Sequence, residues 1–203
     1  MKDLSRLALV LTLIAATAGL VLSMVEQVTR APIAEQRRQE TLRALSAVLP
    51  AFDNQPDADT LTLVVGTDRK GKPVERTFYR ARLGGELSGV AFAVTAPDGY
   101  SGDIVVMVGV DAQGTVTGMA ILRHAETPGL GDKIEDEWFR AQFPGKNLDN
   151  ADWRVKKDGG GFDEITGATI SPRAVVGAMR QGLEFFRAQA AQILSAPAEG
   201  GSP

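Results

Sequence analysis

The chain has 203 residues and a mass of 21.6 kDa, enough for one sizeable globular domain and an additional segment but short for two full domains. It contains no cysteine and one histidine, which excludes disulfides, cysteine-ligated iron–sulfur clusters, thiolate zinc sites and bis-histidine haem. Redox chemistry must therefore use an organic cofactor. The formal net charge is −3; residues 1–30 carry three basic and two acidic side chains, which leaves −4 for the body. This acidic body excludes nucleic acid from the expected partners.

The first thirty residues contain an uncharged apolar stretch, Leu7–Val25. As a helix its 19 residues would span roughly 28 Å, close to the ~30 Å hydrocarbon core of a bilayer. The alternative is a cleaved signal peptide, with Ala16-Thr17-Ala18 as the small-residue cleavage site. Cleavage there would leave Leu20–Val25 as an apolar stub, so the sequence favours an uncleaved transmembrane anchor at residues 7–25.

The charges flanking this stretch predict its orientation. Lys2, Arg6 and the terminal amine precede it, whereas Glu26 follows it directly. By the positive-inside rule, residues 1–6 stay cytoplasmic and the body lies across the membrane. In a Gram-negative bacterium this means an inner-membrane protein whose body is in the periplasm.

Residues 26–60 are predicted to form a helical stalk and a loop. Glu35–Leu49 has apolar residues at helical spacing, and Pro50 ends it. Phe52–Thr60 is a polar loop that contains proline and aspartates. The domain proper begins near Leu61, and the Ala-, Gly-, Pro- and Ser-rich tail at 195–203 is expected to be disordered.

Five segments of the body read as β-strands separated by turn sequences. They are Leu61–Val65, Val74–Leu83, Glu86–Thr95, Ile104–Asp111 and Thr115–Arg123. Ala112-Gln113-Gly114 gives the clearest hairpin signal, because alternating β-branched and small residues flank it on both sides.

Two helices follow. Asp132–Phe143 places Ile134, Trp138 and Phe139 on one face of a short amphipathic helix. The second runs from about Pro172 to Leu194, with Ser171 as its N-cap and Pro172 as its first helical residue. The fold class is therefore α+β, a curved antiparallel sheet flanked by helices.

Two loops carry residue types suited to chemistry. The first, His124–Gly131 (HAETPGLG), combines a rigid proline with glycines that allow close approach to a flat ligand, although an ordinary glycine-rich connection would read the same way. The second, Asp163–Pro172 (DEITGATISP), brings small residues and hydroxyls to the start of the long helix. A helix start favours a phosphate, which the Thr169 hydroxyl could hold, although a plain hydroxyl-rich helix cap is the alternative.

Together these loops resemble a known family. The D-x-x-T-G-A-T pattern at Asp163–Thr169 is similar to the acceptor motif at which a flavin transferase links FMN by a phosphoester to the final threonine. HAETPGLGDKI at His124–Ile134 resembles the companion loop of the same FMN-binding domain, and Gly99–Ile104 and Gly118-Met119 also fit. With the N-terminal span, the chain resembles the G subunits of the Rnf (Rsx) ion-translocating electron-transport complex.

The resemblance implies an FMN-binding domain at residues 61–194 with covalent FMN on Thr169, and no metal. It implies the following further cofactor-binding residues: Glu126, Thr127, Pro128, Gly129, Leu130, Gly131, Lys133, Asp163, Thr166, Gly167 and Ala168. Lys133, His124 and the Thr166 hydroxyl are candidates for tuning the flavin. The implied partners are the other subunits of the complex, the flavin transferase and membrane lipid.

The implied function is electron relay within a redox-driven ion translocase, with no independent catalytic activity. One alternative is the related C subunit of the sodium-translocating NADH:quinone oxidoreductase, which has the same anchor and loops but a longer body. Another is a cofactor-free, membrane-anchored scaffold domain. A free-standing enzyme has less support, because no nucleophile–base pair is visible.

Overall fold

The structure is a computed structural model that describes residues 2–67 and 71–195. The chain divides into two compact units, Met1–Thr41 and Leu42–Pro203. The tail for which disorder is expected lies, after Ser195, outside the described residues.

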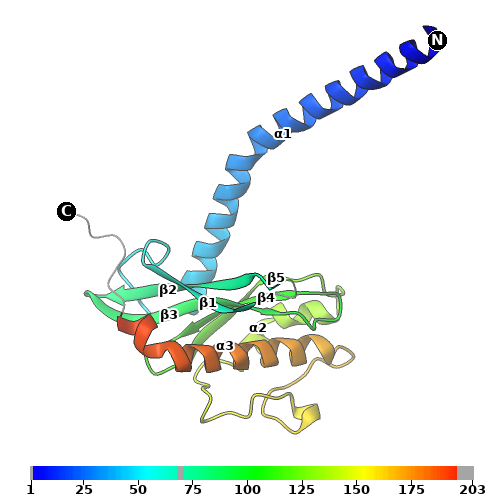
Figure 1. The fold of residues 1–203 in the computed structure, drawn as a ribbon. Helices are drawn as coiled ribbons and strands as arrows, with labels where there is room; N and C mark the ends of the chain where they lie inside the picture. Colours follow the sequence, from blue (N-terminus) through cyan, green and yellow to red (C-terminus); the bar gives the residue numbers. More distant parts are fainter. Residues whose placement is uncertain (1, 68–70, 196–203) are drawn as a thin grey trace. The chain divides into compact units, whose positions relative to one another are not determined.

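Helix α1 spans Lys2–Val48 without interruption (Figure 1). The predicted anchor at 7–25 and the predicted helix at 35–49 both lie in this one helix, which ends one residue earlier than expected. Pro32 lies inside the helix and removes one backbone donor, at a cost of about 3 kcal/mol. The Ala-, Arg-, Glu- and Gln-rich residues around it are strong helix formers, which favours continuation of the helix through the proline.

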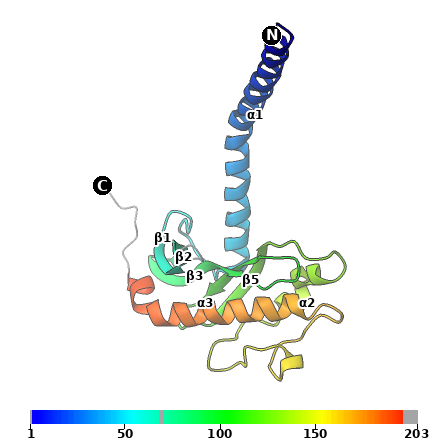
Figure 2. The same ribbon diagram turned by 45° about the vertical axis from the view of Figure 1, so that its right-hand side comes forward.

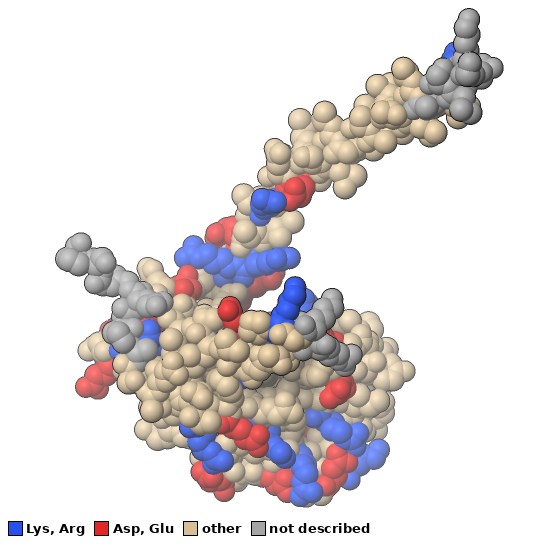
Figure 3. Space-filling view, in the orientation of Figure 1, with Lys and Arg blue, Asp and Glu red and all other residues tan. Residues whose placement is uncertain are grey.

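The first unit displays apolar side chains over a long stretch of α1. This is the one helix among the described residues that is long and apolar enough to cross a membrane. Figure 3 shows a long run of this helix with no charged side chain on the visible face. Glu26 and Arg30 follow the apolar stretch in the sequence and pair at 2.6 Å. Thr17 lies within it and donates its hydroxyl to the carbonyl oxygen of Leu13 at 2.9 Å. The hydroxyl is therefore satisfied within the helix, as an apolar environment requires.

The second unit is built on a five-stranded antiparallel sheet in the order β1-β2-β3-β4-β5. Its strands are β1 (Thr60–Thr67), β2 (Pro73–Leu83), β3 (Glu86–Ala96), β4 (Ile104–Val110) and β5 (Val116–Arg123). The predicted antiparallel architecture is confirmed, and every strand boundary lies within about two residues of its expected place. Gly84 and Gly85, with φ of 62° and 87°, form the tight turn between β2 and β3.

Helix α3 (Ile170–Ser195) lies along one face of the sheet (Figure 2). Phe92 of β3 stacks on Phe186 of α3 with ring centroids 6.0 Å apart. The helix approaches the sheet at Gly182, where a Cβ atom would lie 2.5 Å from Val94. This layer of helix on sheet contains the main hydrophobic core and fixes where α3 begins.

The opposite face of the sheet is covered by the last turns of α1. Leu45 and Val48 are buried against a second, smaller core cluster that includes Ala91 and Met107. The sequence assigned these turns to a stalk outside the domain. In the structure they pack with the sheet, within the unit that begins at Leu42.

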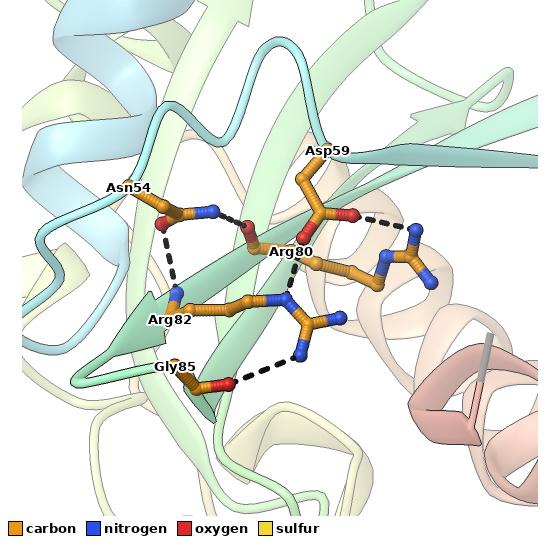
Figure 4. Close-up of polar contacts among 5 residues, drawn as sticks. All are labelled: Asn54, Asp59, Arg80, Arg82 and Gly85. Atoms are coloured by element: carbon orange, nitrogen blue, oxygen red, sulfur yellow. Dashed lines mark hydrogen bonds and ion pairs between the residues drawn. The ribbon is translucent and has the colours of Figure 1, made fainter. Parts of the chain in front are cut away.

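The loop between α1 and β1 is held by a buried polar network (Figure 4). Asp59 forms ion pairs with Arg80 (2.5 Å) and with Nε of Arg82 (2.7 Å). The Asn54 side chain donates to the Arg80 carbonyl oxygen (3.0 Å) and accepts from the Arg82 N–H (2.8 Å). The loop predicted from its polar composition is thus joined to the middle of β2, with Arg80 fully buried.

The predicted helix at Asp132–Phe143 is not one helix. A 3-10 turn, η1 (Gly131–Glu135), is followed by a single α-helical turn, α2 (Glu137–Arg140). Asp136 separates them because its backbone is extended, with ψ of 143°. As a result Ile134 and Phe139 are buried as expected, but Trp138 is 46% exposed.

A cluster of aromatic rings holds the irregular segment that follows, which also contains the 3-10 turn η2 (Lys156–Asp158). Phe143, Trp153 and Phe162 are buried, and Phe143 and Phe162 stack with centroids 4.9 Å apart. This packing fixes the chain just before the second loop, which leads directly into α3.

Candidate functional site

The first loop leaves β5 at His124, and its side chain fixes the loop at both ring nitrogens. Nδ1 accepts a hydrogen bond from the backbone N–H of Glu126 at 3.1 Å. Nε2 lies 3.0 Å from a carboxylate oxygen of Glu135 in η1. His124 is therefore a brace between the loop and η1, and it does not line the cavity described below.

Glu126 is the centre of the site, with only 4% of its surface exposed. One carboxylate oxygen accepts the backbone N–H of Ser101 at 3.0 Å, and the other accepts the Ser171 hydroxyl. Ser101 follows β3 and Ser171 lies in the first turn of α3. A single buried carboxylate thus joins three segments that are far apart in the sequence.

Two glycines make room for this carboxylate. A Cβ atom at Gly131 would lie 2.7 Å from Oε2 of Glu126, and one at Gly99 would lie 3.0 Å from Oε1. A contact as short as the one at Gly131 requires displacement of a neighbour, and the contact at Gly99 is tighter than most real Cβ contacts. The glycines of the first loop therefore serve close packing around Glu126, together with the turn at Gly129, where φ is 77°.

The second loop closes with a tight turn before α3. The N–H of Ala168 donates to the Ile165 carbonyl oxygen at 2.9 Å, and Gly167 takes the left-handed conformation with φ of 83°. The carbonyl oxygen of Thr169 then accepts a hydrogen bond from the backbone N–H of Arg173 at 3.2 Å. Accepting the first bond of the helix is what an N-cap residue does, so Thr169 stands directly at the start of α3.

The prediction that Ser171 is the N-cap was wrong. Helix α3 begins at Ile170, so Ser171 and Pro172 both lie within its first turn. The Ser171 hydroxyl is drawn to the buried Glu126 carboxylate instead of to the helix backbone. The charge-assisted bond to a carboxylate is stronger than a neutral capping bond, which explains the outcome.

The two loops meet around a cavity of about 280 Å³. Its lining residues are Tyr100, Glu126, Thr127, Leu130, Gly131, Gly167, Ala168, Thr169, Ile170 and Ser171. The sequence singled out seven of these as candidate binding residues, and the tertiary structure brings all seven to one cavity. It adds Tyr100, Ile170 and Ser171, which the sequence did not distinguish as ligand contacts because a strand turn and a helix start read as structural elements.

Five predicted binding residues do not line the cavity. Pro128, Gly129 and Lys133 are exposed residues of the first loop and of η1. Thr166 is exposed in the turn before Gly167. Asp163 pairs with Lys156 at 2.6 Å, and its N–H donates to Gln142 at 2.6 Å, so its side chain stabilises the irregular segment.

An ion pair joins the irregular segment to α3 near the cavity. The Arg173 guanidinium donates two hydrogen bonds to the Asp158 carboxylate, at 2.6 and 2.8 Å. These hydrogen bonds lower the pKa of Asp158 below its usual range and raise that of Arg173. The pair is solvent-exposed, so it orients the two segments more than it stabilises them.

Comparison with known proteins identifies the family. Residues 99–184, which include both loops, match the FMN-binding domain, and residues 1–48 match the RnfG N-terminal region. The chain is 44% identical to the G subunit of the ion-translocating oxidoreductase complex of Pseudomonas aeruginosa, over 96% of this chain and 94% of that protein. It is 39% identical to the corresponding G subunit of Aliivibrio fischeri, over 97% of each chain.

The fold is also similar to that of solved structures. These include NqrC of Shewanella oneidensis, with a TM-score of 0.51, 22% identity and coverage of 75% of this chain and 74% of that one. They also include the C subunit of the Na(+)-translocating NADH-quinone reductase of Parabacteroides distasonis, with a TM-score of 0.53, 18% identity and coverage of 80% and 92%. At this identity the likeness concerns the fold alone, whereas the similarity to the G subunits extends over the whole sequence. The chain therefore belongs to the family of G subunits of ion-translocating oxidoreductase complexes.

Proposed function

We propose that this chain is a membrane-anchored flavoprotein that relays electrons within an ion-translocating oxidoreductase complex and carries FMN esterified to Thr169. The observation that supports this most directly is the place of Thr169. It stands at the start of α3 and lines the cavity in which both family loops meet. The family membership supports FMN and the role in a complex.

The residues around Thr169 fit the phosphate end of FMN. Within the described part of the chain, the Thr169 hydroxyl has no hydrogen-bond partner, so it is available for esterification. Gly167 and Ala168 leave space beside it. In the esterification, which the transferase would catalyse, the Thr169 hydroxyl oxygen forms a bond to the phosphorus of an activated flavin donor. The phosphoanhydride bond between that phosphorus and the donor's nucleotide leaving group breaks, the nucleotide monophosphate leaves, and the hydroxyl proton passes to solvent. The α3 start can stabilise the remaining negative charge by roughly 0.3–1 kcal/mol.

Bound FMN supplies the capacity to accept and release electrons. The chain's own residues would hold and orient it: the backbone N–H groups of Ile170 and Ser171 at the start of α3 would be available to the phosphate, and Glu126 keeps the three cavity segments in place. A covalent link also suits a domain outside the cytoplasm, where dissociated FMN would be lost.

Tuning of the flavin by Lys133, His124 and Thr166 remains part of the proposal, although none of them lines the cavity. Lys133 is the most direct to test, because its exposed side chain can be removed without disturbing the core. Lys133→Ala should shift the midpoint potential of the flavin. An unchanged redox titration would assign Lys133 a purely solvent-facing role.

The decisive experiment is to express the full-length chain with a flavin transferase and measure its intact mass. Thr169→Ala should lack the adduct, which equals the mass of FMN less one water, whereas Thr166→Ala is the matched control and should keep it. The unsubstituted protein should also retain its flavin absorbance after denaturation. A protein without flavin would support the cofactor-free scaffold alternative, and an adduct on Thr169→Ala would move the attachment site elsewhere.

The same proposal places residues 1–6 in the cytoplasm and the FMN-binding domain on the periplasmic side of the inner membrane. Alkaline phosphatase fused after Pro203 should then be active, because that reporter folds only outside the cytoplasm. An inactive fusion would indicate the opposite orientation, with the FMN-binding domain in the cytoplasm. The intact mass also distinguishes an uncleaved anchor from a signal peptide cut after Ala18.

A further inference from the structure

Three exposed apolar side chains surround the mouth of the cavity at Thr169. Tyr100 is 68% exposed, and Leu130 and Ile170 are each 43% exposed. All three line the cavity, and they come from three different segments: the β3–β4 turn, the first loop and the start of α3. A cluster of exposed, large apolar side chains is typical of a surface at which an apolar ligand or partner binds.

Tyr100 is held in place by its backbone and not by its ring. The N–H of its neighbour Ser101 donates to the buried Glu126 carboxylate at 3.0 Å. Gly99, on the other side, is packed so closely that a Cβ atom would lie 2.2 Å from the carbonyl oxygen of Gly102. Across residues 2–67 and 71–195, the Tyr100 ring has neither an aromatic partner nor a hydrogen bond. The turn is rigid and the ring is left free to receive a ligand.

The size of the cavity indicates which part of FMN would meet this ring. Its volume of about 280 Å³ is slightly below the range of roughly 300–1,000 Å³ typical of small-molecule sites. Thr169 fixes the phosphate at the inner end, under the function proposed above. The phosphate and ribityl chain then occupy the cavity, and the flat apolar ring system extends to the mouth, where Tyr100 lies.

We propose that Tyr100 is a cofactor-contact residue whose ring stacks on the isoalloxazine of the FMN attached to Thr169, while Leu130 and Ile170 border the stack. This inference rests on the proposed covalent FMN. An aromatic ring offers a large flat surface at low entropic cost, and offset stacking of π-systems is favourable. The contact belongs to the isolated protein and needs no partner chain to form.

Flavin fluorescence tests this contact, because the phenol of a stacked tyrosine passes one electron to the excited flavin and recovers it without net reaction. The quenching requires close contact, and a phenyl ring is too difficult to oxidise to produce it. In the purified, flavin-loaded full-length protein, Tyr100→Phe should therefore raise the fluorescence yield several-fold and remove the fastest decay component. Tyr100→Leu should do the same while also removing the stacking surface.

Tyr79 supplies the control, since it is the other of the two tyrosines in the chain and lies half-buried in β2. Tyr79→Phe should leave yield and decay unchanged. An unaltered yield in Tyr100→Phe overturns the stacking contact, even if covalent flavin is present at full occupancy. Absence of covalent flavin from the unsubstituted protein is a different result, because it overturns the proposed function itself. Because Tyr100→Phe keeps the size of the ring, the test does not depend on whether Tyr100→Leu folds.

Discussion

The Thr117 hydroxyl donates a hydrogen bond of 2.6 Å to the carbonyl oxygen of Val48, the last residue of α1. Gly109 of β4 and Gly118 of β5 lie against this contact, and Gly89 of β3 lies against Pro50, two residues further along the chain. A Cβ atom on Gly109 would lie 2.1 Å from the same Val48 oxygen, and one on Gly118 would lie 2.8 Å from the Val48 Cα. The end of α1 therefore approaches the sheet at glycine residues, where an added Cβ atom would clash with its backbone.

Gly109→Ala should destabilise the folded domain by about 1–3 kcal/mol, the usual cost of overpacking, because the new methyl group meets backbone that cannot move aside. Unfolding by urea in detergent measures the change. Gly66→Ala is the control, since no atom lies within 4 Å of the added Cβ and its φ is not in the left-handed region. Equal stability of the two variants would contradict the close approach of α1 to the sheet.

Asp59→Asn should cost about 3–5 kcal/mol, because it removes the buried charge that lies between the Arg80 and Arg82 guanidinium groups. The matched control is Asp149→Asn. Asp149 pairs with Arg187 at the surface, where a lost ion pair costs only about 0–1 kcal/mol. Chemical denaturation of both variants checks the difference, and a loss at Asp59 no larger than at Asp149 would contradict the role given to the buried network.

Glu126→Ala should lower the fraction of protein that carries flavin, because it releases Ser101 and Ser171 from their shared acceptor. It should also cost about 1–3 kcal/mol of stability, since the buried Ser171 hydroxyl and the partly buried Ser101 N–H lose their acceptor. Glu126→Gln should recover most of the flavin content, because the amide oxygen can accept from Ser101 and the amide nitrogen can donate to Ser171. The flavin-to-protein ratio after denaturation is the measurement. Full flavin content in Glu126→Ala would show that the cavity forms without this carboxylate.

The Asp158–Arg173 pair predicts a pH dependence. The hydrogen bond from Arg173 lowers the pKa of Asp158 in the folded state, so the folded protein binds this proton more weakly than the unfolded chain does. The pair's contribution is therefore present above the ordinary pKa of 3.8 and is lost as the pH falls through the lowered value. Arg173→Gln should be slightly less stable than the unsubstituted protein at pH 7, and the difference should disappear in acid. A difference that persists in acid would show that Arg173 acts by packing instead.

Periodicity and turn chemistry sufficed to predict the elements whose signals are local. Alternating β-branched residues and the Gly84-Gly85 turn located the strands of the antiparallel sheet, since side-chain alternation is a property of each strand by itself. The uncharged stretch at 7–25 similarly identified the apolar segment of α1. The motif residues around Thr169 were recognisable because the resemblance to the family lies in one short contiguous sequence.

Long-range packing decided where the last helix begins. Helix α3 begins at Ile170 with Ser171 turned toward Glu126, because this tertiary contact outweighs a capping preference worth only about 1 kcal/mol. The segment after Gly131 divides at Asp136, whose backbone is extended. The sequence by itself determined that the chain has an apolar N-terminal helix, an antiparallel sheet and a threonine in a motif that resembles a flavin-attachment site. Only the tertiary structure brought Tyr100, Glu126 and Thr169 to one cavity, because they lie on three segments whose proximity depends on the packing of α3 against the sheet.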